Sequence, residues 1–167
     1  MATVGTGGTL TGTARRLREA FPDLEVVAVE PESNPVLSTG EAGQDEFQGM
    51  GPGFVSDILD VEANDAIETV ALADAEAECR RLAREEGILA GQSSGAAMIA
   101  ARRVAERIAD PSLDCPEAPD RDVRLTDGDA TEGPDDAAGD DCPLVVTLFP
   151  DHGERYLSTG LFEAPGE

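Results

Sequence analysis

The sequence predicts an α/β fold of three layers, in which a parallel sheet is covered by helices on both faces. Short runs rich in Val, Ile, Leu and Ala alternate along the chain with stretches of helical periodicity, which is the order that parallel α/β folds produce. These runs are apolar throughout, as expected of strands that are buried on both sides. Two glycine-rich loops each stand between such a run and a helix, and in these folds ligands bind at the carboxyl ends of the strands.

Each predicted element has a local signal of its own. The expected strands are residues 2–4, 24–29, 67–71, 88–90 and 144–149, and the expected helices are residues 10–21, 74–86 and 96–109. Pro22 breaks the first helix, Asp74 is expected to cap the second, and Gly87 is expected to end it. Residues 30–56 are rich in Pro and Gly and are predicted to be mostly loop.

The length of 167 residues fits a single domain with a core of its own. Residues 1–162 are predicted to form a partial α/β domain, and residues 163–167 a short tail. Residues 111–142 interrupt that domain, because they are rich in Asp, Glu and Pro and have almost no periodic apolar residues. Such a composition predicts an acidic disordered insertion.

The charge of the chain excludes several classes of partner. There are 35 acidic residues against 12 basic ones, a net charge of −23, and every basic residue is an arginine. So negative a surface repels DNA, RNA and anionic lipid, and no apolar run or signal peptide points to a membrane, so a cytoplasmic protein is expected. The spread of acidic residues over helices and loops favours adaptation to a cytosol of high salt. The alternative is an ordinary acidic protein with a disordered segment.

The three cysteines, Cys79, Cys115 and Cys142, are far apart in the sequence and odd in number. Because no two of them form a C-x-x-C pair, the sequence predicts neither a disulfide framework nor a metal site, and it fits a reducing compartment. Cys79 lies in a helical pattern, where a small core residue is expected. The single histidine, His152, is expected on a surface loop.

The first glycine-rich loop predicts a phosphate site. It consists of Gly5, Thr6, Gly7, Gly8 and Thr9. Glycines let backbone N–H groups converge on an anion, the following helix adds the positive end of its dipole, and the two threonines add hydroxyls. The loop is not the G-x-x-x-x-G-K-[ST] loop of nucleoside triphosphatases. Glu30 leaves a dinucleotide site open as an alternative, and a tight turn without a ligand is another.

The motifs in combination are more specific than this loop alone. They are Gly5–Gly12, Ala28–Pro31, Pro35–Ser38, Gln48–Phe54, Glu85–Gly91 with Ser93–Ala97, and Pro150–Asp151 with Gly153–Thr159. In this order the chain resembles the C-terminal half of cysteine synthase (O-acetylserine sulfhydrylase), in the family of pyridoxal 5'-phosphate (PLP) enzymes that includes cystathionine β-synthase. The resemblance runs over residues 2–162 apart from the insertion. It implies the large-domain portion of a fold-type II PLP enzyme, similar to the β subunit of tryptophan synthase and truncated at the N-terminus.

The resemblance also implies roles for individual residues. Gly5, Thr6, Gly7, Gly8 and Thr9 bind the PLP phosphate, Ser93 hydrogen-bonds the pyridine nitrogen, and Gly49, Met50 and Gly51 line the amino-acid side. Helix capping is the alternative for Ser93 and Ser94. The family holds PLP covalently on a lysine. This chain has none, so no catalytic residue is assigned to it.

The expected function is therefore that of a cysteine synthase-like protein, which replaces the acetate of O-acetylserine by sulfide to give L-cysteine but is inactive as a lysine-free fragment. The full-length family is expected to be homodimeric and to act on small amino acids. One alternative is a non-catalytic phosphate-ligand-binding protein or a decoy partner of an intact synthase. Another keeps the family but uses O-phosphoserine or forms cystathionine. The α-amino group of Met1 is a weak candidate to replace the lysine, because it lies at the far end of the first strand.

Overall fold

The computed structural model describes residues 1–113, 115 and 142–163. Its sheet has three parallel strands in the order β1-β2-β3, with Ala2 opposite Ala28 and Val29 opposite Glu68. The strands are β1 (Ala2–Thr3), β2 (Val27–Pro31) and β3 (Ala66–Val70), and the α-helices are α1 (Gly8–Arg18), α2 (Val36–Thr39), α3 (Leu72–Arg81) and α4 (Gln92–Ile108). The parallel α/β prediction is confirmed.

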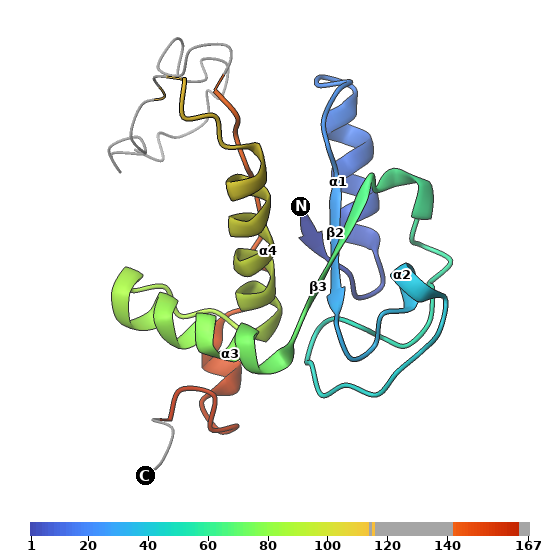
Figure 1. The fold of residues 1–167 in the computed structure, drawn as a ribbon. Coiled ribbons are helices and arrows are strands. Elements are labelled where there is room, and N and C mark those ends of the chain that lie inside the picture. The colour runs from blue at the N-terminus through green and yellow to red at the C-terminus, as the bar shows by residue number, and fades with distance from the viewer. Residues whose placement is uncertain (114, 116–141, 164–167) are drawn as a thin grey trace, which may run out of the picture.

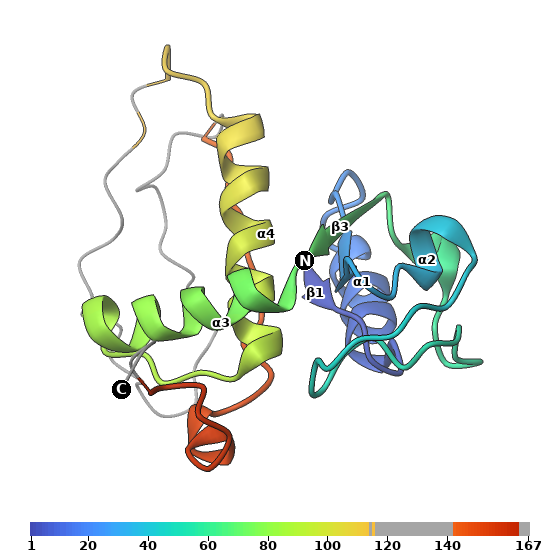
Figure 2. The same cartoon turned by 60° about the horizontal axis from the view of Figure 1, so that its bottom comes forward.

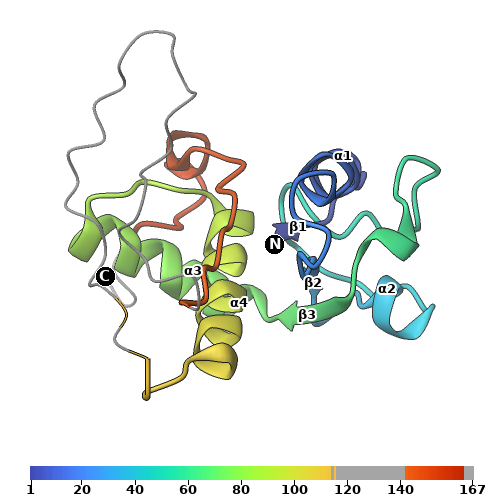
Figure 3. The same cartoon turned by 90° about the horizontal axis from the view of Figure 1, so that it is seen from above.

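Helices lie on both faces of this sheet. Seen from above, α1 and α2 lie on one side of the strands, and α3 and α4 lie on the other (Figure 3). The apolar pattern of β2 explains the arrangement, because successive side chains of a strand point to opposite faces. Val26 and Ala28 belong to the core cluster that contains Leu10 of α1. Val29 belongs to the cluster that contains Ala100 of α4.

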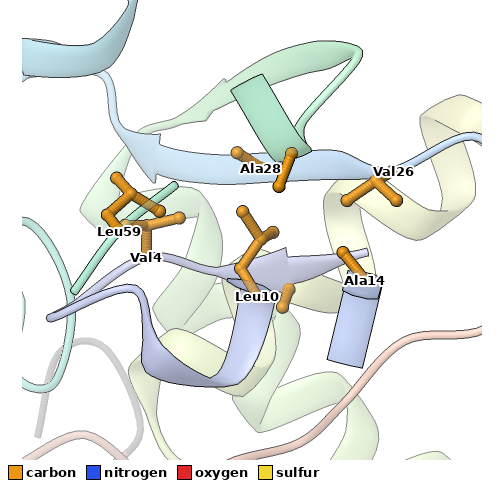
Figure 4. Packing of buried hydrophobic residues seen from close by; sticks show 8 residues of the cluster. Val4, Leu10, Ala14, Val26, Ala28 and Leu59 are labelled. Carbon is orange, nitrogen blue, oxygen red and sulfur yellow. The ribbon is translucent and has the colours of Figure 1, made fainter. Parts of the chain in front are cut away.

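The first of these clusters fixes the start of α1 against the sheet. Leu10 of the helix points toward Val4, Ala28 and Leu59, and Ala14 faces Val26 in the same cluster (Figure 4). Leu10 is 2% exposed, and burying a side chain of its size stabilises a fold by about 1.5–3 kcal/mol. The loop between β1 and α1 is thereby held between two elements that share a core.

The helix ends agree with the sequence in part. Gly87 has φ 69° and ends a π-helical turn, Leu82–Glu86, that continues α3, as the glycine predicted. The capping role expected of Asp74 is wrong, because α3 begins at Leu72 and the residue before it, Ala71, holds the cap position. Asp74 instead lies in the first turn, where its carboxylate interacts favourably with the positive end of the helix dipole.

Two predicted strands are not strands in the described part of the chain. Residues 88–90 form only an isolated antiparallel bridge, from Ala90 to His152, and residues 144–149 form neither a strand nor a bridge. Leu144 and Val146 are 84% and 59% exposed. Apolar composition predicts burial, but a strand also needs a neighbour that forms hydrogen bonds with its backbone N–H and C=O groups. For residues 144–149 the described chain supplies one such contact, from the α-amino group of Met1 to the carbonyl of Val146 at 2.8 Å.

The expectation for the cysteines is wrong for two of them. Cys115 and Cys142 form a disulfide with Cα atoms 5.7 Å apart. Their separation of 27 residues gives no local sequence signal of the pairing. Cys79 is the free cysteine and is fully buried, as predicted. The proposed acidic insertion at 111–142 lies mostly outside the described residues.

The C-terminal segment packs beneath α3 and the start of α4, where it is drawn in red (Figures 1 and 2). Tyr156, in the short helical turn Gly153–Tyr156, forms a core cluster with Cys79 and Leu161. Tyr156 is 1% exposed and packs this segment onto the domain. Its ring lies against Gly91, the residue before α4, since a Cβ there would lie 2.4 Å from it.

Candidate functional site

The glycine-rich loop lies between β1 and α1 and leaves helix N–H groups open to a ligand. Gly7 is the N-terminal cap of α1, and no side chain caps this helix. The first N–H groups of a helix have no partner within it, so those of Gly8 and Thr9 are available to an anion. Thr6, Gly8 and Thr9 are exposed, so nothing in the described chain covers them. The arrangement suits a phosphate group and is the feature by which PLP fits this chain.

A second loop, Gln48–Gly51, lies directly beside the first. The amide of Gly51 donates a 3.0 Å hydrogen bond to the carbonyl of Val4, the residue before the phosphate loop. A Cβ atom on Gly5 would lie 3.0 Å from the carbonyl oxygen of Gly49, closer than most side chains tolerate. Two segments 44 residues apart therefore meet through backbone atoms.

Ser93 completes the group from the first turns of α4. It is 1% exposed, and its Oγ lies 3.7 Å from the position that a Cβ on Gly49 would take. The capping alternative for the two serines is wrong, because Gly91 is the cap residue and no side chain caps α4. The hydroxyl of Ser94 instead donates to the carbonyl of Asp151 at 3.3 Å.

The residues expected to line the amino-acid side of the ligand are Gly49, Met50 and Gly51, and they differ in backbone conformation and burial. Gly49 and Gly51 have φ angles of 92° and 67°, which glycine adopts without strain. Met50 is 4% exposed, and its side chain belongs to the core cluster of Phe47 and Ala96. It can therefore present only its backbone to a ligand.

Two buried carboxamides that the sequence did not single out hold this second loop. Gln92 is 5% exposed, and its Oε1 accepts a 3.0 Å hydrogen bond from the amide of Gln48. Asn34 is 4% exposed and donates to the carbonyl of Gly51 at 2.9 Å. Asn and Gln in loop-rich sequence are common, so no local pattern separates these two from surface residues.

The carboxylate of Glu30 accepts hydrogen bonds within the fold and is not available to the ribose of a dinucleotide. It is 2% exposed, and its carboxylate accepts hydrogen bonds from the amides of Leu37 at 2.7 Å and Ser38 at 2.9 Å. The hydroxyl of Ser38 donates to the same carboxylate. Because these donors belong to α2, Glu30 stabilises the start of that helix and has no free oxygen for a ribose.

The remaining candidate groups lie away from the loops. His152 is exposed, and its Nδ1 accepts from the amide of Glu154, which agrees with the surface position expected of it. Burial raises the pKa of the Cys79 thiol to about 11, and the thiol donates to the carbonyl of Gly91, so it is not a nucleophile. Burial also lowers the pKa of the Met1 amine, but this amine is bound to the carbonyl of Val146.

No group of three or more His, Cys, Asp or Glu side chains is placed to hold a metal ion in the part of the chain that the structure describes. No described helix is both long and apolar enough to cross a membrane.

Comparisons with known proteins agree with this geometry. Residues 1–113 match the family model described as "Pyridoxal-phosphate dependent enzyme". The chain is 40% identical over 162 residues to a cysteine synthase of Staphylococcus aureus (strain Mu50 / ATCC 700699) and 41% identical to a probable cysteine synthase of Bacillus subtilis (strain 168). In both cases the match covers 97% of this chain and 42% of the relative, so the chain spans less than half of their length.

A solved structure leads to the same family. The O-acetylserine sulfhydrylase isoform 3 of Entamoeba histolytica superposes with a TM-score of 0.74 at 32% identity, over 99% of this chain and 40% of that one. The parallel α/β arrangement is thus that of a fold-type II PLP enzyme. Since the family model covers more than half of its 167 residues, the chain belongs to the family of pyridoxal-phosphate-dependent enzymes.

Proposed function

We propose that this chain forms the phosphate- and ring-binding part of a cysteine synthase, the enzyme that replaces the acetate of O-acetylserine by sulfide to give L-cysteine. The observation that carries the proposal is the meeting of the phosphate loop at Gly5, the second loop at Gly49 and the hydroxyl of Ser93. The 40% identity to cysteine synthases supports this branch of the family.

Each of the three parts has its own task. The open N–H groups at the start of α1, with the hydroxyls of Thr6 and Thr9, hold the phosphate of PLP. Ser93 offers a neutral hydroxyl to the pyridine nitrogen. The backbone of Gly49–Gly51 lines the side on which the amino acid binds. When bound, PLP supplies a ring that withdraws electrons from the substrate.

The choice of serine at the ring nitrogen bears on the reaction type. A carboxylate there would hold a proton on the nitrogen and make the ring a strong electron sink, whereas a neutral hydroxyl does so far less. Ser93 therefore favours loss and replacement of a group at the β-carbon over reactions that need a long-lived carbanion.

The chain by itself is proposed to be inactive, because it has no lysine to hold PLP covalently or to move the α-proton. The amine of Met1 does not replace it, since it donates to the carbonyl of Val146 at the opposite end of β1 from the phosphate loop. The proposal thus separates binding, which this chain performs, from turnover, which it does not.

The test measures the two separately on the purified chain. Equilibrium dialysis is expected to show that PLP binds and that pyridoxal, which has no phosphate, binds far more weakly. Borohydride reduction followed by mass spectrometry is expected to leave the chain unlabelled, and cysteine is not expected to form from O-acetylserine and sulfide. Equal binding of PLP and pyridoxal would overturn the phosphate site, and cysteine formation by this chain alone would overturn the claim of inactivity.

A further inference from the structure

Asn34 makes three hydrogen bonds from a buried position in the loop after β2. Its Nδ2 donates to Oδ2 of Asp45 at 2.8 Å and to the carbonyl of Gly51 at 2.9 Å, and its Oδ1 accepts from the amide of Gly43 at 2.8 Å. Both amide hydrogens are used, along with one lone pair. Asn34 is 4% exposed, so these bonds form where water does not compete.

The contact with Gly51 ties the second loop to the loop that follows β2. The amide of Gly51 is bound to the carbonyl of Val4 at 3.0 Å while its own carbonyl is bound to Asn34. A Cβ at this position would lie 2.4 Å from the ring of Pro31, so Gly51 has no room to shift toward β2. The peptide groups before and after Gly51 are thus both held, two residues after the Gly49 carbonyl that meets Gly5.

Asp45 supports Asn34 without touching the loop carbonyl. Its Oδ1 accepts from the amide of Phe47 at 2.7 Å, while its Oδ2 accepts from Asn34. Asn34 therefore does two separable things: it ties Asp45 to the fold, and it orients the carbonyl of Gly51. The two contacts use different hydrogens of the same amide group.

We propose that Asn34 is a positioning residue that fixes the Gly49–Gly51 backbone beside Ser93 and thereby sets the affinity of the site for the amino-acid end of its ligand. This inference rests on the proposed function, since it assumes that the loop lines the amino-acid side. Asn34 acts through Gly51, and none of its three hydrogen bonds is to the phosphate loop.

A pair of nearly isosteric exchanges separates the two contacts. Asn34→Asp keeps the acceptor for Gly43 but removes both donors and sets a carboxylate against Asp45. The combined change Asn34→Asp with Asp45→Asn restores a hydrogen bond between positions 34 and 45, now donated from position 45, and conserves the net charge. The carbonyl of Gly51 then lacks its donor and faces the carboxylate at position 34. Asp45→Asn alone leaves Asn34 its contact with Gly51 but gives up one of the two acceptor contacts of position 45, so it is the control for that loss.

Two readouts are needed, thermal unfolding and ligand affinity. The ligands are PLP and N-(phosphopyridoxyl)-L-serine, a stable secondary amine that joins the cofactor to an amino acid. Asn34→Asp is expected to lower Tm and to weaken the serine conjugate. The combined variant is expected to recover the part of Tm that the contact between positions 34 and 45 contributes, but to bind the conjugate about tenfold more weakly than the original chain, the equivalent of one net hydrogen bond. Its affinity for PLP is expected to stay within about twofold.

The outcomes distinguish the inference from the proposed function. Recovery of conjugate affinity together with Tm in the combined variant would show that Asn34 acts only through Asp45 and would overturn the inference. Weakening of the conjugate by Asp45→Asn alone would overturn it as well. Should Asn34→Asp fail to fold, the combined variant carries the test. If the original chain binds PLP and the serine conjugate with equal affinity, the inference alone is overturned. If it binds neither PLP nor the conjugate, the proposed function is overturned as well.

Discussion

The hydroxyl of Tyr156 donates a 2.5 Å hydrogen bond to Oδ2 of Asp151. The tyrosine ring also lies where a side chain on Gly91 would be, since a Cβ there would come within 2.4 Å of the ring. Gly91 directly precedes α4, and Ser93 follows two residues later. One side chain of the C-terminal segment thus supports the part of the helix that carries the proposed ring-binding serine.

Removing this hydrogen bond is expected to weaken the fold modestly. Tyr156→Phe keeps the ring against Gly91 and removes only the hydroxyl, so the free energy of unfolding should fall by about 0.5–1.5 kcal/mol. Urea unfolding at neutral pH measures the change. Tyr156→Ala is the comparison, since it also leaves a cavity and should cost about 3–5 kcal/mol, as for other large aromatic side chains. If Tyr156→Phe were as stable as the original chain, the hydrogen bond would contribute nothing.

The same tyrosine gives the protein a pH dependence of known sign. Burial, and then the hydrogen bond to Asp151, raise the pKa of Tyr156 above its ordinary value of 10.0. The unfolded chain therefore releases the proton first, so stability falls as the pH rises above 10. The chain has a single tyrosine, so tyrosinate absorbance reports this group alone. The midpoint is expected above 10 in the native chain and near 10 in urea, and equal midpoints would contradict the burial of the hydroxyl.

Replacing Gly7, the cap residue of α1, is expected to destabilise the fold, whereas replacing Gly12 inside the same helix is not. Gly7 has φ 83°, and a Cβ there would lie 2.6 Å from two atoms of Leu59. Gly7→Ala should destabilise the fold by about 1–3 kcal/mol from backbone strain alone, and it should weaken PLP binding. A Cβ on Gly12 meets nothing within 4 Å, so Gly12→Ala should stabilise α1 by about 0.5–1 kcal/mol. Urea unfolding of both variants, with dialysis against PLP, checks the contrast.

The number of reactive thiols tests the pairing of the cysteines. The structure joins Cys115 to Cys142 and leaves Cys79 buried. An aromatic disulfide reagent should therefore react slowly with the native chain, with one thiol in denaturant, and with three after reduction. Three thiols in denaturant without a reductant would show that the disulfide does not form. Cys79→Ala, which should abolish the single denatured-state thiol, is the control.

Salt is expected to raise the stability of this chain. With a net charge of −23 the native state repels itself, and molar potassium chloride screens this repulsion over a few ångströms. Tm should therefore rise steadily between dilute buffer and molar salt. Equal Tm values at the two ends would contradict the proposed adaptation to a cytosol of high salt. Sucrose, which stabilises proteins without screening charge, controls for effects of excluded solutes.

Much of the fold was predictable because its signals are local. The continuous apolar run at residues 26–29 predicts a strand buried on both faces, and its side chains pack into a core cluster on each side, while the glycines at 5–9 mark the loop before α1. Gly87 ends its helix through a conformation that glycine favours. The phosphate loop, the second glycine loop and Ser93 were each found in the sequence, and the structure brings them together.

What the sequence could not supply is pairing between distant residues. The apolar run at 144–149 has the composition of a strand, but no strand of the described residues lies beside it to form a ladder. Cys115 pairs with Cys142 across 27 residues, and no local pattern marks the two as partners. Asn34 and Gln92 are buried because loops fold over them, and nothing in their neighbours in sequence indicates this.

The proposed ligand cradle at Gly5, Gly49 and Gly51 is built from main-chain atoms, and its glycines contribute no side chain at all. Main-chain atoms are the same in every sequence, so mutation cannot alter them directly. A lineage could therefore replace its surface residues, lysines among them, by acidic residues. The main-chain groups proposed to bind the ligand would stay the same. Adaptation of the surface to high salt and conservation of the proposed binding site thus involve different residues of one small chain.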